Sequence, residues 1–279
     1  MGELLLENMT LGDLQTTLRW AEAEGWNPGT ADADAFLAAD PKGFFLARLD
    51  GEPVAAISVV NHDADNAFLG LYICRPQWRG QGIGLSTWTH ALKHAGDRSV
   101  GLDGVPEQEE NYRKSGFVRT GQTLRYVGRV PPAKAPDVRE AAAHDLRRLM
   151  ELDAEANGFS RPKFIEAWLS PVPGKRSSRV LIRNGELVGF ATWRACIEGT
   201  KIGPMVAPDT KDALDLISNI ALIRADGPLI IDTPEGNVAL RRELESAGFA
   251  VPFVTARMYR GGAPDQSALL QAIATMELG

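Results

Sequence analysis

The chain resembles itself at an offset of 132–134 residues. Asp50-Gly51-Glu52 recurs as Asn184-Gly185-Glu186, and Ser115-Gly116-Phe117 recurs as Ala247-Gly248-Phe249, in the same order along the chain. A repeat of this length is a whole domain, because domains of about 100–150 residues are the commonest size. The 279 residues are therefore predicted to hold two copies of one architecture.

A proline-rich stretch, residues 131–136, separates the two copies. Such a composition is typical of an extended linker between domains. We therefore predict a first domain over residues 1–130 and a second over residues 137–279. The last part of the second domain, residues 265–277, is predicted to form a short helix.

Hydrophobic periodicity and turn residues predict mixed secondary structure in the first copy. Strands are expected at residues 3–9, 43–49, 53–61, 68–74, 98–102 and, after Phe117, 123–129; helices are expected at residues 11–24, 30–39, 85–95 and 106–115. Asp50-Gly51 is a hairpin signal between two of the strands. The predicted fold class is α/β (α+β), and each copy is expected to form a mixed, mostly antiparallel sheet flanked by helices.

A glycine-rich turn joins the predicted strand 68–74 to the predicted helix 85–95, with glycines at positions 80, 82 and 84. Glycine lets the backbone turn tightly and approach a ligand closely. The first N–H groups of a helix lack partners, and the helix dipole adds positive potential there. Arg79 adds a full positive charge, so the turn is predicted to bind a pyrophosphate. The spacing does not fit the dinucleotide fingerprint or the nucleoside-triphosphate loop.

The pattern Arg-x-x-Gly-x-Gly resembles the coenzyme A loop of the GNAT superfamily of N-acetyltransferases, and the order of predicted elements is similar to that fold. The resemblance implies acetyl-CoA as cosubstrate, no metal, and direct transfer of the acetyl group to an amine in a ternary complex. By this resemblance, the donor is bound by Tyr72, Ile73, Cys74, Arg79, Gly80, Gln81, Gly82, Ile83 and Gly84.

The second copy has lost this loop. Lys211-Asp212-Ala213-Leu214-Asp215-Leu216 stands opposite the glycine-rich turn. The carboxylates of Asp212 and Asp215 would repel a pyrophosphate at a helix N-terminus. The second copy is therefore predicted to be a degenerate GNAT-like domain that does not bind coenzyme A in the usual way.

The resemblance implies that Tyr112, four residues before Gly116, is the general acid that protonates the leaving thiolate. The backbone N–H of Ile73 or Cys74 would stabilise the developing oxyanion. An asparagine common in the family is replaced here by Val105, so the pantetheine contact is expected from the backbone near Asp103 and Gly104. A covalent role for the Cys74 thiol is disfavoured, because an apolar strand raises a thiol pKa.

The general base is left open among four side chains. Glu24 is the tentative choice, and His62, Asp63 and Asp103 are the alternatives. The acceptor is expected to contact Trp26 and Asn27, in the loop after the first helix, together with Asp103 and with Asp232, at a strand end of the second copy. Trp26 offers a face for a cation or a flat acceptor, although the loop also reads as a rigid turn and Asp232 as a helix cap.

Composition narrows the remaining classes of function. The net charge of −6 disfavours nucleic acid as a partner, because phosphate binding needs clustered cations. Two cysteines do not make a disulfide framework. We expect no leader peptide and no membrane span, hence a cytoplasmic monomer or homodimer. The expected function is an acetyl-CoA-dependent N-acetyltransferase acting on a small-molecule primary amine; the alternatives are a protein lysine or N-terminal acetyltransferase, and a non-catalytic acyl-CoA-binding regulator.

Overall fold

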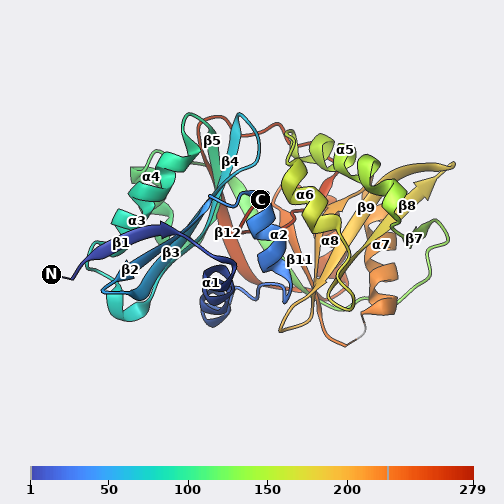
Figure 1. Ribbon diagram of the computed structural model, residues 1–279. Helices are drawn as coiled ribbons and strands as arrows, with labels where there is room; N and C mark the ends of the chain where they lie inside the picture. The colour runs from blue at the N-terminus through green and yellow to red at the C-terminus, as the bar shows by residue number, and fades with distance from the viewer. Residues whose placement is uncertain (1, 225) are drawn as a thin grey trace.

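The computed structural model describes residues 2–224 and 226–279 and joins the strands of both halves in one sheet (Figure 1). The first half contains β1 (Leu4–Asn8), α1 (Leu11–Ala23), α2 (Asp32–Ala39), β2 (Phe44–Leu49), β3 (Glu52–Asn61), β4 (Asn66–Cys74), α3 (Ile83–Leu92), β5 (Ser99–Gly104), α4 (Glu109–Lys114) and β6 (Val118–Gly128). The second contains β7 (Val138–Glu140), α5 (Leu146–Asn157), α6 (Pro162–Leu169), β8 (Arg176–Arg183), β9 (Glu186–Ala195), β10 (Thr200–Val206), α7 (Thr210–Ile223), β11 (Leu229–Pro234), α8 (Val238–Ser246), β12 (Ala250–Arg260) and β13 (Leu270–Ala272). The predicted fold class is confirmed.

Corresponding hairpins of the two halves have the same backbone geometry. The φ angles are 50° and 85° at Asp50 and Gly51, and 53° and 83° at Asn184 and Gly185. Two consecutive left-handed residues match the twist of the strands that they connect, and short polar residues followed by glycine adopt this geometry most easily. The sequence repeat is therefore also a structural repeat.

Alternate residues of the strands face two different helical layers. Phe44 and Leu46 of β2 pack in the same apolar cluster as α1 and α2, whereas Phe45 packs with Trp88 of α3 on the opposite face. This is the two-residue period of a strand buried on both faces. The first apolar cluster also contains Trp168 of α6, whose ring lies 5.9 Å from that of Phe36 of α2. The two halves thus share one core.

The halves exchange their last strands. β12 of the second half pairs with β5 of the first, and β6 of the first half pairs with β11 of the second. β6 and β12 also pair with each other, so the order through the centre is β5-β12-β6-β11. The division of the chain into residues 1–130 and 137–279 stays a prediction: residues 131–136 form neither helix nor strand, but the sheet runs through both halves.

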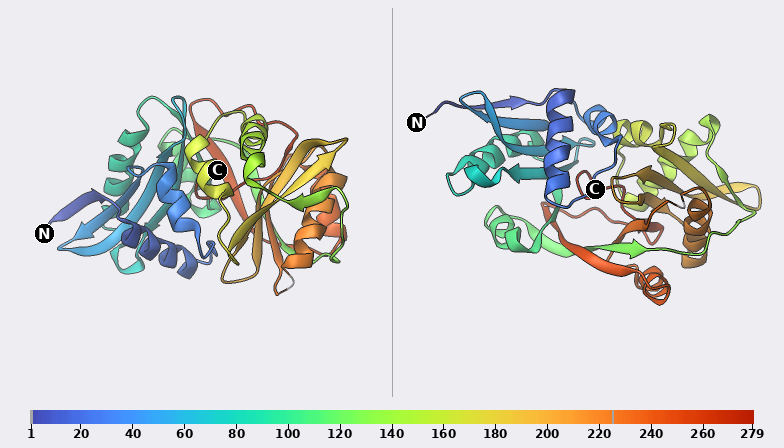
Figure 2. Two further views of the ribbon diagram at one scale, coloured as in Figure 1. Left: turned by 45° about the vertical axis from the view of Figure 1, so that its right-hand side comes forward. Right: turned by 90° about the horizontal axis from the view of Figure 1, so that it is seen from below.

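The prediction of a helix at residues 265–277 is wrong. This segment contains β13, which pairs with β10, and then runs without helix through the centre of the molecule, where Figures 1 and 2 place the C-terminal label. Residues 270–279 are all buried. A surface helix needs a polar face toward solvent, whereas this run is enclosed on every side between the halves.

His62, at the end of β3, holds the buried segment. Its Nε2 donates a hydrogen bond to the carbonyl oxygen of Leu278 over 2.8 Å. The neutral ring can donate only as the Nε2–H tautomer. Burial, with a smaller contribution from the nearby Arg161 charge, lowers the pKa of His62 to about 4.

The stability of the protein is expected to fall as the pH drops from about 6.5 toward 4. In this window the unfolded chain binds a proton at His62 that the folded chain does not bind, so protonation favours unfolding. The shift corresponds to about 3 kcal/mol in the free energy of unfolding. Chemical denaturation at several pH values measures the slope, which His62→Gln should reduce and the exposed control His144→Gln should not. An unchanged slope in His62→Gln would contradict this assignment.

Candidate active site

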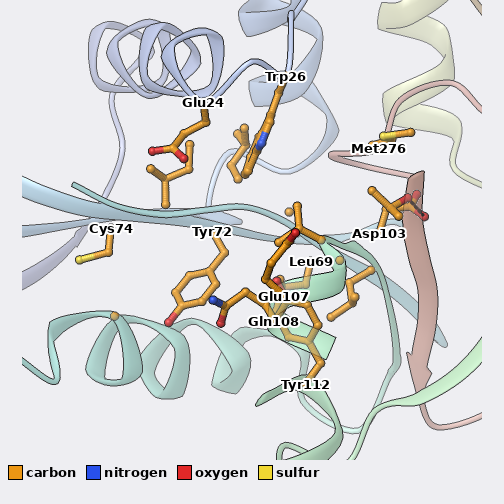
Figure 3. Close-up of a pocket in the computed structure, with 18 of the residues that line it drawn as sticks. Glu24, Trp26, Leu69, Tyr72, Cys74, Asp103, Glu107, Gln108, Tyr112 and Met276 are labelled. Carbon is orange, nitrogen blue, oxygen red and sulfur yellow. Dashed lines mark hydrogen bonds between the residues drawn. The ribbon is translucent and has the colours of Figure 1, made fainter. Parts of the chain in front are cut away.

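A pocket of about 680 Å³ lies where β4 and β5 separate (Figure 3). The first half contributes most of its wall, and the second half contributes Phe253 and Thr255 of β12 together with Met276 and Glu277. From the first half, the wall includes Glu24, Trp26, Tyr72, Cys74, Arg79, Gly80, Gly82, Gly84, Asp103, Gln108, Tyr112 and Arg125. Seven of the nine predicted donor residues therefore meet Tyr112 in one cavity. The other two do not line it: the Gln81 side chain donates to the carbonyl oxygen of Gln77, and Ile83 is buried in the core.

The glycine-rich turn has the conformation that an anion site requires. Gly80 and Gly82 have φ angles of 76° and 81°, which favour glycine. A Cβ at Gly84 would lie 2.8 Å from the hydroxyl of Tyr72. α3 begins directly after Gly82 and has no side-chain cap, so its first N–H groups are available to a ligand. These residues fit a pyrophosphate.

Arg79 lies at the same end of the pocket. Its Nε donates to the carbonyl oxygen of Cys74 over 2.8 Å, and its Nη2 forms an ion pair with Glu24 over 2.6 Å. About half of the Arg79 side chain is exposed, so it can turn toward a bound phosphate. Burial raises the pKa of the Cys74 thiol, and Arg79 only partly offsets this effect. The raised pKa agrees with the view that Cys74 is not a nucleophile.

The backbone of β4 is open toward the pocket beyond Leu69. β4 pairs with β5 from Asn66 to Leu69 and no further. An irregularity in its pairing with β3 follows, and Leu71 has a φ angle of 48°. A bulge bends a strand and turns its unpaired backbone groups away from the ladder. The N–H and C=O groups around Leu71 are thus free to pair with a ligand.

Tyr112 lines the pocket and is largely buried. Its ring stacks on Trp88, with 5.5 Å between the centroids, and packs against Gly104 so closely that a Cβ there would lie 2.2 Å from it. Burial raises the pKa of Tyr112, with smaller contributions from Tyr72 and Glu107. The hydroxyl is therefore protonated at neutral pH and can donate a proton or a hydrogen bond.

Two of the predicted acceptor residues are engaged in ion pairs between the halves. Asp103 of β5 binds Arg257 of β12 through both carboxylate oxygens, at 3.0 and 2.5 Å. Asp232 of β11 binds Arg125 of β6 in the same way, at 2.8 and 2.9 Å. Arg125 and Arg257 are equivalent in the repeat, so each exchanged strand is fixed by the same kind of pair. Asp103 lines the pocket, but its carboxylate is committed to Arg257.

The other predicted residues divide between the pocket and its surroundings. Trp26 lines the pocket, while the side chain of Asn27 points away and bonds both backbone groups of Glu198. His62 lies under the buried segment described above. Asp63 accepts hydrogen bonds from Asn66 within the β3–β4 turn. Neither His62 nor Asp63 lines the pocket.

Sequence reasoning expected the second half to contribute Asp232 to the acceptor side, but it missed the residues of that half that line the pocket. Phe253, Thr255, Met276 and Glu277 line it from positions more than 130 residues after the glycine-rich turn. Residues 265–277 have no counterpart in the first copy, so the repeat gave no signal for Glu277. The strand exchange carries β12 to the pocket, and no local pattern reports such an exchange.

The pocket combines an anion-binding turn, an opened strand and a protonated tyrosine. These features suit the transfer of an acyl group from an acyl-CoA. Models described as "Acetyltransferase (GNAT) family" and "Acetyltransferase (GNAT) domain" match residues 12–117 and 149–270. The chain belongs to the GNAT family and is an acyltransferase with two GNAT domains in tandem.

Similar proteins span almost the whole chain. Holothin acyltransferase of Pseudoalteromonas sp. (strain SANK 73390) is 35% identical over 276 residues, which cover 97% of this chain and 92% of that protein. A solved structure of a Pyrococcus horikoshii protein has a TM-score of 0.82 at 22% identity and covers 99% of this chain and 96% of that one. A solved tandem GNAT protein from the clavulanic acid biosynthesis pathway has a TM-score of 0.63 at 16% identity, covering 92% and 98% of the two chains.

No helix in the described part of the chain is long and apolar enough to cross a membrane.

Proposed function

We propose that the protein transfers an acetyl group from acetyl-CoA to the primary amine of a small molecule by direct attack in a ternary complex. The observation that carries this proposal is the composition of the pocket wall. Phe253, Thr255 and Met276 of the second half line the pocket together with the glycine-rich turn of the first. A pocket with walls from both halves fits a small molecule better than an extended peptide. The name of the 35% identical relative, holothin acyltransferase, supports the same class of acceptor.

In the proposed reaction, the acetyl-CoA pyrophosphate lies on the glycine-rich turn and Arg79. The pantetheine arm follows the open backbone of β4, which brings the thioester toward Tyr112. The amine nitrogen attacks the thioester carbon, the new C–N bond forms, the nitrogen loses one proton to a general base, and the C–S bond breaks. The Tyr112 hydroxyl gives its proton to the departing thiolate.

The proposal is tested by titrating the protein with acetyl-CoA in a calorimeter and by measuring thiol release with a panel of primary amines. Saturable binding with amine-dependent thiol release supports the proposal. Binding without release above the rate of hydrolysis, for every amine of the panel, would favour an acyl-CoA-binding regulator instead.

Tyr112→Phe is expected to lower kcat about 10- to 100-fold and to leave the Kd for acetyl-CoA within threefold of the wild-type value. Phenylalanine keeps the stacking on Trp88 and removes only the proton donor. Tyr126→Phe is the matched control, because Tyr126 donates to Glu245 and does not line the pocket. A wild-type kcat in Tyr112→Phe would show that Tyr112 is not the acid, while the acyltransferase activity itself would stand.

A further inference from the structure

The segment after β13 places Glu277 of the second half in the wall of the pocket. The carbonyl oxygen of Glu277 lies so close to β4 that a Cβ at Gly70 would be 2.1 Å from it. Only glycine permits this approach. Gly70 directly precedes Leu71, where the backbone of β4 opens toward the expected thioester. Glu277 is thus held beside the reacting end of the donor site.

Four buried side chains fix the segment on both sides of Glu277. Before it, Arg194 donates to the carbonyl oxygen of Ala274 over 3.1 Å, and Arg125 contacts the sulfur of Met276 at 3.4 Å. After it, His62 donates to Leu278 and Arg161 donates to the carbonyl oxygen of Gly279. Side chains whose backbone is held in this way act in a defined geometry, which is what a catalytic group needs.

The Glu277 carboxylate differs from those of Asp103 and Glu24, which also line the pocket. The residue is 4% exposed, and its Oε2 accepts a hydrogen bond from the Thr275 hydroxyl. Among the described residues, no Lys, Arg or His lies within ion-pair distance of this carboxylate. Asp103, in contrast, is neutralised by Arg257, and Glu24 by Arg79. The buried cations Arg125, Arg194 and Lys201 act on this carboxylate from farther away. Because none of them pairs with it directly, its oxygens can bind an incoming ammonium ion or accept a proton.

Glu277 and Glu24 also differ in where they lie along the pocket. Glu24 and Cys74 lie at one end of the view in Figure 3, and Met276 and Asp103 lie at the other. The Glu24 end is that of Arg79 and the glycine-rich turn, where the pyrophosphate is expected. Glu277 follows Met276 in the chain and lines the pocket together with it.

We propose that Glu277 is the general base of the reaction, so that the degenerate second half supplies a catalytic group to the first. This inference rests on the proposed function above. As the amine nitrogen forms the C–N bond, its proton passes to the Glu277 carboxylate. The C–S bond breaks, and the thiolate takes the proton of Tyr112. After product release, Glu277 loses its proton to water and Tyr112 regains one from water, so the cycle needs no other reactant.

The acceptor class follows from the same geometry. An alkylamine has a pKa of about 10 and reaches the pocket mainly as an ammonium ion. The Glu277 carboxylate attracts this cation first and then removes its proton. We therefore expect the acceptor to carry an aliphatic, positively charged amine.

The test is Glu277→Gln, assayed with acetyl-CoA and the best alkylamine of the panel. Glutamine has the same shape and can still accept from Thr275, but it cannot take up a proton. We expect kcat to fall about 100-fold, in the range of general-base effects, with an unchanged Kd for acetyl-CoA and an unchanged melting temperature. In the variant, the rate should also rise with pH, because the free amine must then form in solution. Glu277→Asp, which restores a carboxylate, should recover part of the rate.

Glu186→Gln is the matched control, because Glu186 is an exposed residue at the start of β9, far from the pocket, and its loss changes the net charge equally. A Glu277→Gln variant with kcat within threefold of the wild type would overturn the role of Glu277 and leave the proposed function standing. Loss of acetyl-CoA binding in the variant would also overturn it, since the residue would then be structural. A wild-type protein that acetylates no amine would overturn the proposed function, and this inference with it.

Discussion

Gly82→Asp is expected to weaken acetyl-CoA binding about ten-thousandfold. A side chain at a φ angle of 81° costs roughly 1–2 kcal/mol, which drives the turn out of the conformation that binds. The new carboxylate would also lie against the pyrophosphate. Two like charges about 4 Å apart at a protein surface repel by about 4 kcal/mol, and each 1.4 kcal/mol is about tenfold in Kd. Calorimetric titration of the wild type and the variant measures the change.

Gly185→Asp provides a closely matched control for this substitution. Gly185 has a φ angle of 83° and, like Gly82, has open space where a Cβ would be placed, but it lies in the β8–β9 hairpin. The same strain and the same charge are thus introduced far from the pocket. We expect Gly185→Asp to bind acetyl-CoA like the wild type. Equal weakening in both variants, or none in either, would contradict the assignment of the turn to the pyrophosphate.

Arg125→Leu is expected to lower the free energy of unfolding by about 3–5 kcal/mol, the cost of leaving one partner of a buried ion pair uncompensated. The side chains of Arg125 and Asp232 are 7% and 6% exposed, and their pair crosses from β6 to β11. Arg125 Nη1 also donates to the carbonyl oxygen of Trp26 over 3.0 Å. Urea denaturation measures the loss of stability.

The double variant Arg125→Met with Asp232→Leu distinguishes the effect of an unpaired buried charge from the effect of the lost hydrogen bond to Trp26. Apolar side chains in place of both ions are expected to restore most of the stability. Both the single and the double variant lack the hydrogen bond from Arg125 to the carbonyl oxygen of Trp26, so we expect the KM for the acceptor to be raised in both. Arg147→Met, at a surface pair whose arginine is 93% exposed, should change neither quantity. A single Arg125→Leu variant as stable as the wild type would contradict the role assigned to this pair.

Local signals in the sequence were sufficient for most of the first half's elements and for the conformation of the glycine-rich turn. Gly80 and Gly82 adopt the left-handed conformation expected of the turn, and Asp50-Gly51 forms the expected hairpin. These features depend on the conformational limits of one or two residues, which a sequence reports directly. Arg79 and Tyr112 line one pocket, as predicted from the same short-range order of strand, turn and helix.

The acceptor side could not be predicted in the same way. β6 and β12 are equivalent in the repeat, and each has a pattern that would pair with either β5 or β11. The choice between partners depends on long-range packing and on the pairs Asp103–Arg257 and Asp232–Arg125, which only the folded chain brings together. The expected helix at residues 265–277 was wrong for a related reason, since enclosure from both halves overrides local preference.

The exchange of β6 and β12 gives the molecule the topology of a strand-swapped homodimer folded within a single chain. In a swapped dimer of one-copy chains, each subunit would lend its last strand to its neighbour. Here the connection from β6 to β7 joins the end of one such subunit to the start of the other. Once the two subunits are fused, only one of them needs to keep a donor site. The other is free to lose its glycine-rich turn and to change its final residues, which now reach the pocket of its neighbour.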